Sequence, residues 1–446
     1  MIKTKRGFNL RFLKILWVVF LSAGIIAIII LGYIFRFKLL HISLYSLSFY
    51  GFFTLVHFFL QIVFANCNKN KWKNSSNYLP SISIVIACYK EDPELLRKCL
   101  KSINNQDYKN VTQIILSNDG MEQYIKQIFN EASKGRKEWI YLCNIHRGKR
   151  AVMYDAFNIA TGEIIVCMDS DTVIYNDAVG HLVKPFLTNS SVACTTGNIR
   201  LINSKKNFLT KITDMRYWLA FNLERSAQSF FGAVSCVSGP FGAYRKEVIE
   251  KIKDEWINQK FLGNNCTIGD DRNLTNLVLS IGLKSVFVSE ALAETESPET
   301  LLKWLKQQLR WSRSFYREFF INLRWFHKNS PWLAFDLTYQ AVFPFFLLSN
   351  MLTMLYLAAT RNILYIALSI FSMVFFGLIR ALYGAFFTRN PYFLIFVAYS
   401  FLNAFLLAPI KLYALLTLWK SNWGTQPRNI FYTGIQFKEA EETSNI

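Results

Sequence analysis

The sequence contains no C-x-x-C pair, and none of its five histidines has the spacing of a metal ligand. The eight cysteines are scattered, and several fall inside apolar, strand-like runs, a pattern typical of reduced thiols in the cytosol. Internal repeats and low-complexity tracts are also absent. His146 opens the basic loop HRGKR and is interpreted as a loop residue rather than as a catalyst.

Charged side chains are scarce, at 18% of the 446 residues, whereas 52% of the residues are hydrophobic. This balance predicts a soluble domain joined to a membrane domain. Lys and Arg number 50 against 30 Asp and Glu, a formal net charge of +20. Such an excess suits nucleic-acid binding, anchoring at the cytoplasmic side of a membrane, or handling of anionic substrates. Because much of the basic charge flanks apolar runs, we expect the last two and no nucleic acid as a partner.

Two uncharged apolar runs lie near the N-terminus, at residues 15–35 and 40–65. Each reaches the roughly 20 residues that a helix needs to cross ~30 Å of hydrocarbon. The first run is too long for a signal-peptide core and has no small-residue cleavage pattern, so we expect it to remain as an anchor. Basic stretches at residues 3–14 and 69–73 flank the pair, which predicts a hairpin with both flanks in the cytoplasm.

Three further apolar windows follow, at residues 332–359, 363–387 and 391–419. Three crossings would put the C-terminus outside, yet Lys411, Lys420 and Arg428 favour the inside. A bend and return of the third window near residues 403–409 would reconcile the two observations. The sequence is compatible with two to four C-terminal spans.

From Ser81 onward, short apolar runs alternate with amphipathic stretches, which is typical of βαβ units. A loop at residues 146–150 precedes a helix expected at 151–160. Because the carboxyl ends of parallel strands meet at one edge of a sheet, the side chains that follow four of the strands should gather there. These side chains are Tyr89, Glu91, Asp119, Lys149, Arg150, Asp169 and Asp171.

The run IIVCMDSDT at residues 164–172 stops abruptly on Asp169 and Asp171. Side chains alternate along an extended chain, so both carboxylates point the same way and can hold a hard divalent cation that also binds phosphate oxygens. We therefore expect a metal diphosphate as the ligand. A strand that ends in solvated turn acids is the alternative that these letters alone leave open.

Two later segments also carry candidate site residues. CVSGPFGAYR at residues 236–245 is interpreted as a Gly/Pro turn between apolar segments, which suits a backbone close to a bound substrate. CTIGDDR at residues 266–272 puts Asp270 and Asp271 at the start of a helical pattern, where a helix N-cap is the simpler explanation for one acid. The basic, aromatic stretch at residues 297–328 predicts an amphipathic helix in the membrane interface.

Together these motifs resemble those of the processive, membrane-integrated family 2 glycosyltransferases, which include the cellulose, chitin and hyaluronan synthases. The similarity rests on Asp119, the D-x-D at 169–171, the GDD at 269–271 and the Q-x-x-R-W at 307–311. Within that group, HRGKRAVMY, CVSGPFGAYR, GDDRNLTN, QQLRWSRS and the WGT at 423–425 are most similar to hyaluronan synthases. The basic continuation expected after WGT is missing from this chain.

For the donor substrate, the resemblance implies that Asp171, with Asp169 nearby, holds Mg²⁺ or Mn²⁺ on the phosphates of a UDP-sugar. Lys149 and Arg150 would pair with the diphosphate as charge-assisted donors. Asp119 and the loop at 89–91 would hold uridine. The full set of implied nucleotide contacts is Tyr89, Glu91, Asp119, Lys149, Arg150, Asp169, Gln307, Arg310 and Trp311.

For the acceptor, the resemblance implies that Asp271, with Asp270 beside it, takes the proton from the attacking hydroxyl. Trp311 would offer an aromatic face to the acceptor sugar. Cys266 corresponds to a cysteine near the acceptor pocket, although a buried structural thiol explains it equally well. The other implied acceptor residues are Ser238, Gly239, Pro240 and Arg245.

The implied fold is an α/β GT-A domain with a mostly parallel sheet, inserted between transmembrane helices and accompanied by interfacial amphipathic helices. The expected parts are a transmembrane hairpin at 1–73, a cytoplasmic GT-A domain at 74–296, interfacial helices at 297–330, a transmembrane region at 331–420 and a cytoplasmic tail at 421–446. The implied protein is a multi-pass enzyme of the cell membrane.

The implied activity is polymerisation of hyaluronan from UDP-GlcNAc and UDP-GlcA, with export of the growing polysaccharide through the enzyme's own membrane domain as a monomer in the lipid bilayer. One alternative is a chitin-type synthase that uses UDP-GlcNAc alone. The other is a catalytically silent export scaffold, which has no physical need for a paired metal site and a base.

Overall fold

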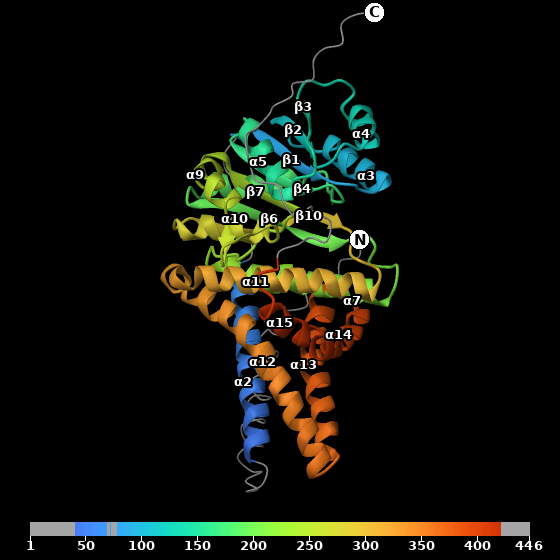
Figure 1. Cartoon of the computed structure of the whole chain (residues 1–446), viewed down its shortest axis with the longest axis vertical. Coiled ribbons are helices and arrows are strands. Elements are labelled where there is room, and N and C mark those ends of the chain that lie inside the picture. The colour runs from blue at the N-terminus through green and yellow to red at the C-terminus, as the bar shows by residue number, and fades with distance from the viewer. Residues whose placement is uncertain (1–40, 69–71, 73–77, 421–446) are drawn as a thin grey trace, which may run out of the picture.

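The computed structural model describes residues 41–68, 72 and 78–420. An α/β domain lies at the top of Figure 1, and one long helix, α11 (Leu301–Asn329), runs across beneath it. Three helices project further down: α2 (His41–Cys67), α12 (Pro331–Thr360) and α13 (Leu364–Thr388). The span expected at 15–35 and the WGT motif lie outside the described residues.

An eight-stranded sheet with the order β3-β2-β1-β4-β7-β6-β10-β5 forms the centre of the α/β domain. Only β7 and the two-residue β5 run antiparallel to their neighbours, so the sheet is mostly parallel, as predicted. The strands are β1 (Ile82–Cys88), β2 (Val111–Asn118), β3 (Trp139–Cys143), β4 (Ile164–Asp169), β5 (Val173–Ile174), β6 (Val192–Leu201), β7 (Phe241–Arg245) and β10 (Lys284–Thr295), and a separate ribbon pairs β8 (Lys260–Phe261) with β9 (Asn264–Asn265).

The segment at 236–245 differs from its sequence interpretation, because only its first half is a turn. Phe241 and Ala243 are fully buried, and Tyr244 is nearly so, since β7 lies between β4 and β6 in the middle of the sheet. A Cβ on Gly242 would lie 2.1 Å from Val237 Cγ1. The small residues that suggested a turn therefore allow a central strand to pass close to the preceding loop.

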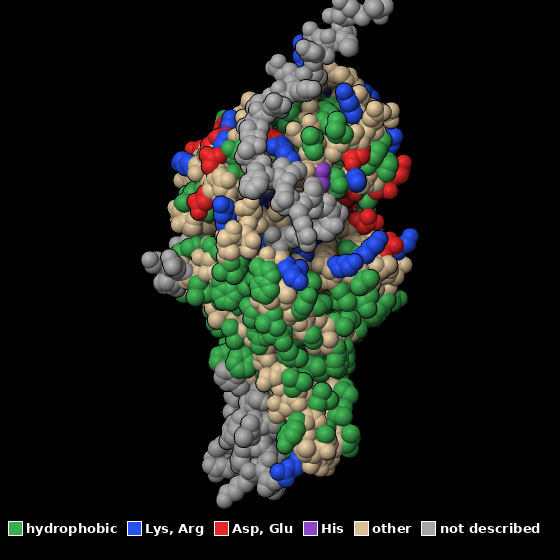
Figure 2. Space-filling model, in the orientation of Figure 1, with side chains coloured by type: hydrophobic (Ala, Val, Ile, Leu, Met, Phe, Trp, Pro, Cys, Tyr) green, Lys and Arg blue, Asp and Glu red, His purple; other side chains and the backbone are tan. Residues whose placement is uncertain are grey.

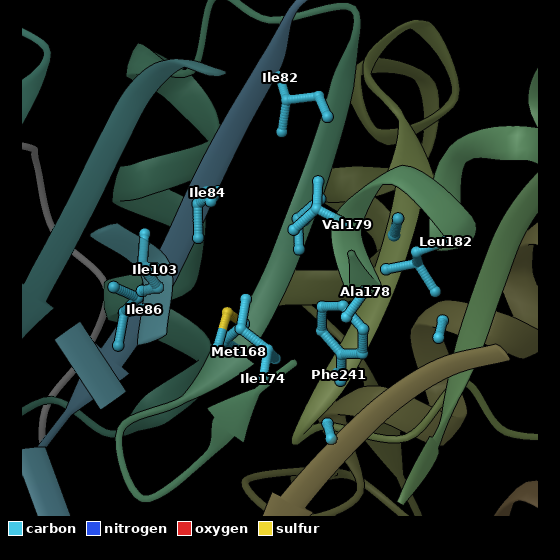
Figure 3. Close-up of a cluster of buried hydrophobic side chains, with 14 of the residues drawn as sticks. Ile82, Ile84, Ile86, Ile103, Met168, Ile174, Ala178, Val179, Leu182 and Phe241 are labelled. Carbon is cyan, nitrogen blue, oxygen red and sulfur yellow. The ribbon is translucent and has the colours of Figure 1, made fainter. Parts of the chain in front are cut away.

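Helices cover both faces of the sheet. One layer contains α3 (Pro93–Asn104), α4 (Gln123–Ser133) and α6 (Ala178–Thr188); the other contains α5 (Lys149–Ile159), α9 (Lys246–Ile257) and α10 (Asp270–Ser280). On β1, Ile84 and Ile86 pack in the first layer and Val85 in the second, because successive side chains of a strand point to opposite faces. Figure 3 shows the first of these clusters, with Val179 and Leu182 of α6 beside β1 and β4.

The register of the strands brings their functional ends to one edge. Ala87 of β1 lies opposite Asp169 of β4, and Asn118 of β2, next to Asp119, lies opposite Cys88. Because β7 runs the other way, its first residue, Phe241, lies opposite Met168 at this same edge. The turn that precedes β7 is therefore a neighbour of the two aspartates after β4.

Among the described residues, four segments are long and apolar enough to cross a membrane: Tyr50–Cys67, Pro331–Thr360, Leu364–Thr388 and Pro391–Leu415. The last of these is broken into η2 (Pro391–Phe396), α14 (Val397–Leu402), the π-helical turn η3 (Asn403–Leu407) and α15 (Ala408–Leu415). Figure 1 shows α14 and α15 directly below α11, well above the tips of α12 and α13. The π-helical turn coincides with residues 403–409, where a bend and return was considered, but the backbone stays helical from α14 through η3 into α15.

The surface changes character at the level of α11. Charged side chains gather over the sheet and its helices, whereas hydrophobic side chains cover most of the visible surface from α11 downward (Figure 2). Between the sheet and the apolar helices lies a continuous segment of α7 (Phe208–Leu219), the π-helix η1 (Ala220–Arg225) and α8 (Ser226–Phe230). This segment links the site at the sheet edge to the membrane-directed helices.

Candidate active site at the sheet edge

A cavity of about 560 Å³ opens at the carboxyl ends of β1, β2 and β4 and continues between η1 and α11 toward the apolar helices. Its lining also includes Gln340 from α12 and Tyr399 from α14. The cavity brings together most of the residues that the sequence analysis selected. They are Tyr89, Glu91, Asp119, Lys149, Asp169, Asp171, Ser238, Gly239, Pro240, Asp270, Asp271, Gln307, Arg310 and Trp311.

Asp119 anchors one end of the cavity and is only 2% exposed. Its carboxylate accepts the backbone N–H groups of Arg147 at 2.7 Å and Gly148 at 2.8 Å, and it contacts His146 Nδ1 at 2.9 Å. Burial raises the pKa of Asp119, and the backbone N–H of Arg147 opposes this shift. The His146 ring in turn stacks on Tyr89, with centroids 4.1 Å apart. Asp119 therefore fixes the basic loop beside a flat aromatic pair.

The acids after β4 share a crowded, charged environment. Asp169 forms an ion pair with Lys149, whose Nζ also lies 3.5 Å from Asp270 Oδ2. Burial and the neighbouring charges of Asp169 and Glu91 raise the pKa of Asp171 to about 7. The hydroxyl of Thr295, which donates to Asp171 Oδ1 at 3.1 Å, opposes that shift. Three carboxylates thus repel one another at this edge, as they would where a cation binds.

The two acids of the GDD motif open helix α10 and have different partners. Gly269 is the N-cap at φ +80°, and no side chain caps the helix, so the capping explanation for Asp270 and Asp271 is wrong. Burial alone would raise the pKa of Asp270, but Lys149 outweighs it and the pKa is lowered. Burial and the charge of Asp270 raise the pKa of Asp271. Two adjacent carboxylates with opposite shifts are typical of an acid–base site.

Helix α11 closes the cavity from the membrane side with its Q-x-x-R-W motif. Burial lowers the pKa of Arg310, and the charges of Asp270 and Asp271, which line the same cavity, oppose that shift. Trp311 is 40% exposed, and its ring lies 6.4 Å from the ring of Tyr217 on α7. The motif thus contributes one cation and one aromatic face to the same cavity.

Three predicted site residues are not at the cavity. Arg150 is buried on the other side of α5, where Nη1 donates to the Trp256 carbonyl at 2.6 Å and the guanidinium lies over the Trp256 ring. Helix α5 begins at Lys149 rather than at residue 151, and consecutive helical residues point about 100° apart, so Lys149 and Arg150 diverge. Arg245 ends β7 at the opposite edge of the sheet and donates to the carbonyl groups of Val192 and Phe186.

Cys266, the third of these residues, is 4% exposed but does not line the cavity. Burial raises the pKa of its thiol. The structural explanation for this cysteine is therefore the better one. By contrast, Cys236 does line the cavity, and its Sγ lies 3.5 Å from Asp271 Oδ2.

The structure also adds residues that the sequence analysis did not select. At the membrane end of the cavity, Arg216 pairs with Glu224 at 2.9 Å, and Arg225 donates to the Cys236 carbonyl at 3.3 Å. Burial alone would raise the pKa of Glu224, but Arg216 outweighs it and the pKa is lowered. In the sequence, Arg216, Glu224 and Arg225 are only charged residues of an amphipathic stretch, and that pattern does not predict where their side chains lie. The ion pair joins α7, which carries Arg216, to the π-helix η1, which carries Glu224 and in which ordinary helical spacing does not apply.

Known proteins resemble this chain both in its α/β domain and over most of its length. Residues 80–314 match the family described as "Glycosyltransferase like family 2". Hyaluronan synthase 3 of Mus musculus is 32% identical over 91% of this chain and 81% of that protein. Hyaluronan synthase 2 of Rattus norvegicus is 33% identical over 92% and 81%. Hyaluronan synthase 1 of Xenopus laevis is 32% identical over 93% and 80%.

Among solved structures, a mannosyltransferase from Pyrobaculum calidifontis in complex with GDP-Man and Mn²⁺ has a similar fold. It superposes with a TM-score of 0.56 at 19% identity, covering 80% of this chain and 99% of that one. The predicted GT-A fold is thereby confirmed.

Proposed function

The chain belongs to the hyaluronan synthases within the family 2 glycosyltransferases, and on that premise we propose that it polymerises hyaluronan from UDP-GlcNAc and UDP-GlcA by inverting transfer. One observation carries the proposal. A single cavity contains the acids after β4, the raised-pKa carboxylate of Asp271, the Arg310–Trp311 motif and, further in, side chains of the membrane-directed helices. The donor site, the proposed base and the exit of the polymer would thus lie in one continuous cavity.

We propose that Asp171 and Asp169 hold Mg²⁺ or Mn²⁺. Their oxygens are hard ligands, and a cation would offset the burial and the carboxylate repulsion that together raise the pKa of Asp171. Among the described residues, no group of three or more His, Cys, Asp or Glu side chains forms a complete metal site. The remaining ligands would be diphosphate oxygens and water, as suits a cation that arrives with its nucleotide. When bound, the cation would neutralise charge on the leaving diphosphate.

The residues around that site are suited to the rest of a UDP-sugar. Tyr89, stacked on His146, offers a flat surface to the uracil base beside the buried carboxylate of Asp119. Lys149 is held by Asp169 and Asp270 and can move its ammonium group onto the diphosphate. The Arg310 guanidinium would approach the same diphosphate from α11.

Asp271 is the proposed base. Its raised pKa makes it a better proton acceptor than an ordinary carboxylate, whereas Lys149 keeps the neighbouring Asp270 ionised. The turn at Ser238–Pro240 and the exposed face of Trp311 would hold the acceptor sugar with its hydroxyl toward Asp271. Loss of the proton to Asp271 makes that hydroxyl oxygen a nucleophile, which would attack the anomeric carbon of the donor sugar as its bond to the UDP oxygen breaks.

We further propose a multi-pass protein of the cell membrane that works as a monomer, with the sheet domain in the cytoplasm. The change from a charged to an apolar surface below α11 supports a sheet domain that lies outside the hydrocarbon (Figure 2). The basic stretches at 3–14 and 69–73 favour the cytoplasmic side. The growing chain would leave past Arg216, Gln340 and Tyr399 into the membrane domain. A polymer with a carboxylate on alternate sugars needs such a polar, protein-lined route, because hydrocarbon excludes charge.

The test uses purified full-length protein in detergent with Mg²⁺ and the two UDP-sugars, supplied singly and together. We expect a polymer only when both are present, and a hyaluronan-specific lyase should digest it. A lyase-resistant polymer from UDP-GlcNAc alone would identify a chitin-type synthase instead. Absence of UDP release under all conditions would identify a silent scaffold.

A further inference from the structure

A carboxylate with no contact to solvent lies between the helices below the cavity. Asp336 of α12 is 0% exposed, and its two oxygens accept from three side chains on three helices. Oδ1 lies 2.7 Å from Nε2 of His57 on α2. Oδ2 accepts from Gln228 on α8 at 2.6 Å and from Gln340, one turn along α12, at 3.0 Å. A buried carboxylate is costly unless hydrogen bonds satisfy it, and here they do.

Gln228 connects this carboxylate to the active-site loop. Its amide nitrogen donates to Asp336, while its amide oxygen accepts the backbone N–H of Ser235 at 3.0 Å. Both ends of the amide are therefore engaged, so its orientation is fixed. Because Gln228 is only 4% exposed, loss of Asp336 would leave a buried N–H donor without a partner and allow the amide to turn.

The loop that Gln228 holds leads directly to the proposed base. Ser235 precedes Cys236, whose Sγ lies 3.5 Å from Asp271 Oδ2. The next backbone N–H, that of Val237, donates to Thr275 Oγ1 on α10, the helix that carries Asp271. A shift of the loop at Ser235 would therefore be felt at Asp271 and at the turn that faces the acceptor.

The His57 end of the network is equally well defined. The His57 ring stacks on Tyr339, with centroids 3.8 Å apart, and lies nearly parallel to Trp332 at 5.9 Å. His57 and Asp336 thus tie α2 to α12, while Gln228 ties both helices to the loop. An apolar pair would join the two helices equally well, but it could not orient Gln228.

We propose that Asp336 is a positioning residue for glycosyl transfer, acting through Gln228 to hold the loop at Ser235–Cys236 against Asp271. The membrane-directed helices α2 and α12 are then part of the acceptor side of the active site rather than only its anchor. This inference rests on the proposed role of Asp271 as the base. Helices α2 and α12, whose apolar composition indicates only a membrane anchor, would thus also position the catalytic groups.

The experiment compares Asp336→Leu, which keeps a side chain of similar shape but accepts no hydrogen bond, with Gln228→Leu and the double variant in purified full-length protein. We expect kcat for UDP release to fall by roughly ten- to a hundredfold, because small misplacement of reacting groups costs that much. UDP affinity and the KM for each UDP-sugar should stay within about twofold of wild type, since the donor end of the cavity is untouched. The double variant should be no slower than the slower single variant, because both break one connection.

Tyr339→Phe is the matched control. Tyr339 donates to Thr54 at 3.2 Å across the same α2–α12 interface and does not line the cavity. Phe removes that hydroxyl but keeps the ring that stacks on His57, so the connection from Asp336 to Gln228 stays intact. This variant should turn over at the wild-type rate. An equal loss of kcat in Tyr339→Phe, or loss of UDP binding together with kcat, would reduce Asp336 to a structural role. Gln228→Leu keeps the test decisive if Asp336→Leu does not fold.

A parallel Asp271→Asn variant distinguishes failure of the positioning role of Asp336 from failure of the proposed base. If it is inactive while Gln228→Leu and Asp336→Leu keep wild-type kcat, only the positioning role fails. If Asp271→Asn itself turns over normally, the proposed base fails, and this inference fails with it.

Discussion

At the scale of single residues, Asp270 and Asp271 are adjacent in the chain but meet different partners. Lys149 holds Asp270 ionised, whereas Asp271 faces the Cys236 thiol and has a raised pKa. Neither acid caps helix α10. A substitution that removes only proton acceptance should therefore affect chemistry more than folding.

We expect Asp271→Asn to bind UDP-sugar normally while transfer falls by roughly 10²-fold or more, because the amide keeps the shape but cannot accept the proton. Nucleotide titration and UDP release measure the two effects separately. Asp177→Asn, at the start of α6 and away from the cavity, is the control and should behave as wild type. Parallel loss of binding and turnover in Asp271→Asn would argue for a structural role.

The pKa of Asp171 gives the metal site a pH dependence. In metal-free protein this pKa is raised from its ordinary value of 3.8 to about 7. The folded protein then holds a proton that the unfolded chain has lost, so this group's contribution to stability falls as pH rises across that interval. Mn²⁺ binding requires the ionised form. Its affinity should therefore increase from about pH 6 to 8 and then level off.

Electron paramagnetic resonance of Mn²⁺ in the presence of UDP would follow that binding. Asp171→Asn should lose both the affinity and its rise with pH, and EDTA should abolish UDP release by the wild type. Polymer synthesis that persists in EDTA would rule out the metal assignment.

At the scale of elements, the end of the apolar run predicted that Asp169 and Asp171 would reach the sheet edge, and both line the cavity there. The alternation that should have aligned their side chains does not extend to Asp171, because β4 ends at Asp169 and Asp171 lies in the turn that follows. The first residue of α5 could not be predicted from the sequence to within two residues. A difference of two residues in its N-terminus decides that Lys149 faces the cavity and Arg150 faces Trp256. The Arg216–Glu224 pair could not be located, since it depends on a π-helical turn that has no periodic signature.

The contact between α10 and α11 offers a test at this scale. Gly269 has φ +80°, and a Cβ there would lie 1.9 Å from Ser314 Oγ on α11. Gly282, also at φ +80°, has no atom within 4 Å of an added Cβ. Alanine should cost about 1–3 kcal/mol of backbone strain at either position. Gly269→Ala should in addition displace α11 and so reduce transfer.

Thermal unfolding and UDP release of Gly269→Ala and Gly282→Ala in detergent would separate these effects. We expect both variants to melt at a lower temperature than wild type because of similar backbone strain. The fall should be larger in Gly269→Ala than in Gly282→Ala, and only Gly269→Ala should lose activity. Equal behaviour of the two variants would mean that α11 is not held by this close approach.

At the scale of the whole molecule, basic side chains line both ends of the cavity, with Lys149 beside the acids after β4 and Arg216 toward the apolar helices. Arg380 of α13 and Lys411 of α15 lie close enough to Glu224 to interact with it electrostatically. The Arg380 guanidinium also lies over the Phe58 ring of α2, 5.8 Å from its centroid. Both cations are thus near the Arg216–Glu224 pair at the inner end of the cavity, where an exported polyanion would pass.

Joint replacement of Arg380 and Lys411 by Gln should leave UDP release in detergent nearly intact but reduce the polymer delivered across the membrane of sealed vesicles. The reason is that a polyanion in a low-dielectric passage depends on fixed cations, whereas chemistry at Asp271 does not. Lys98→Gln with Lys101→Gln, two exposed changes on α3, is the control of equal charge. If delivery and turnover both stay at wild-type levels, these two cations anchor the helices at the headgroups, and the polymer leaves by another route.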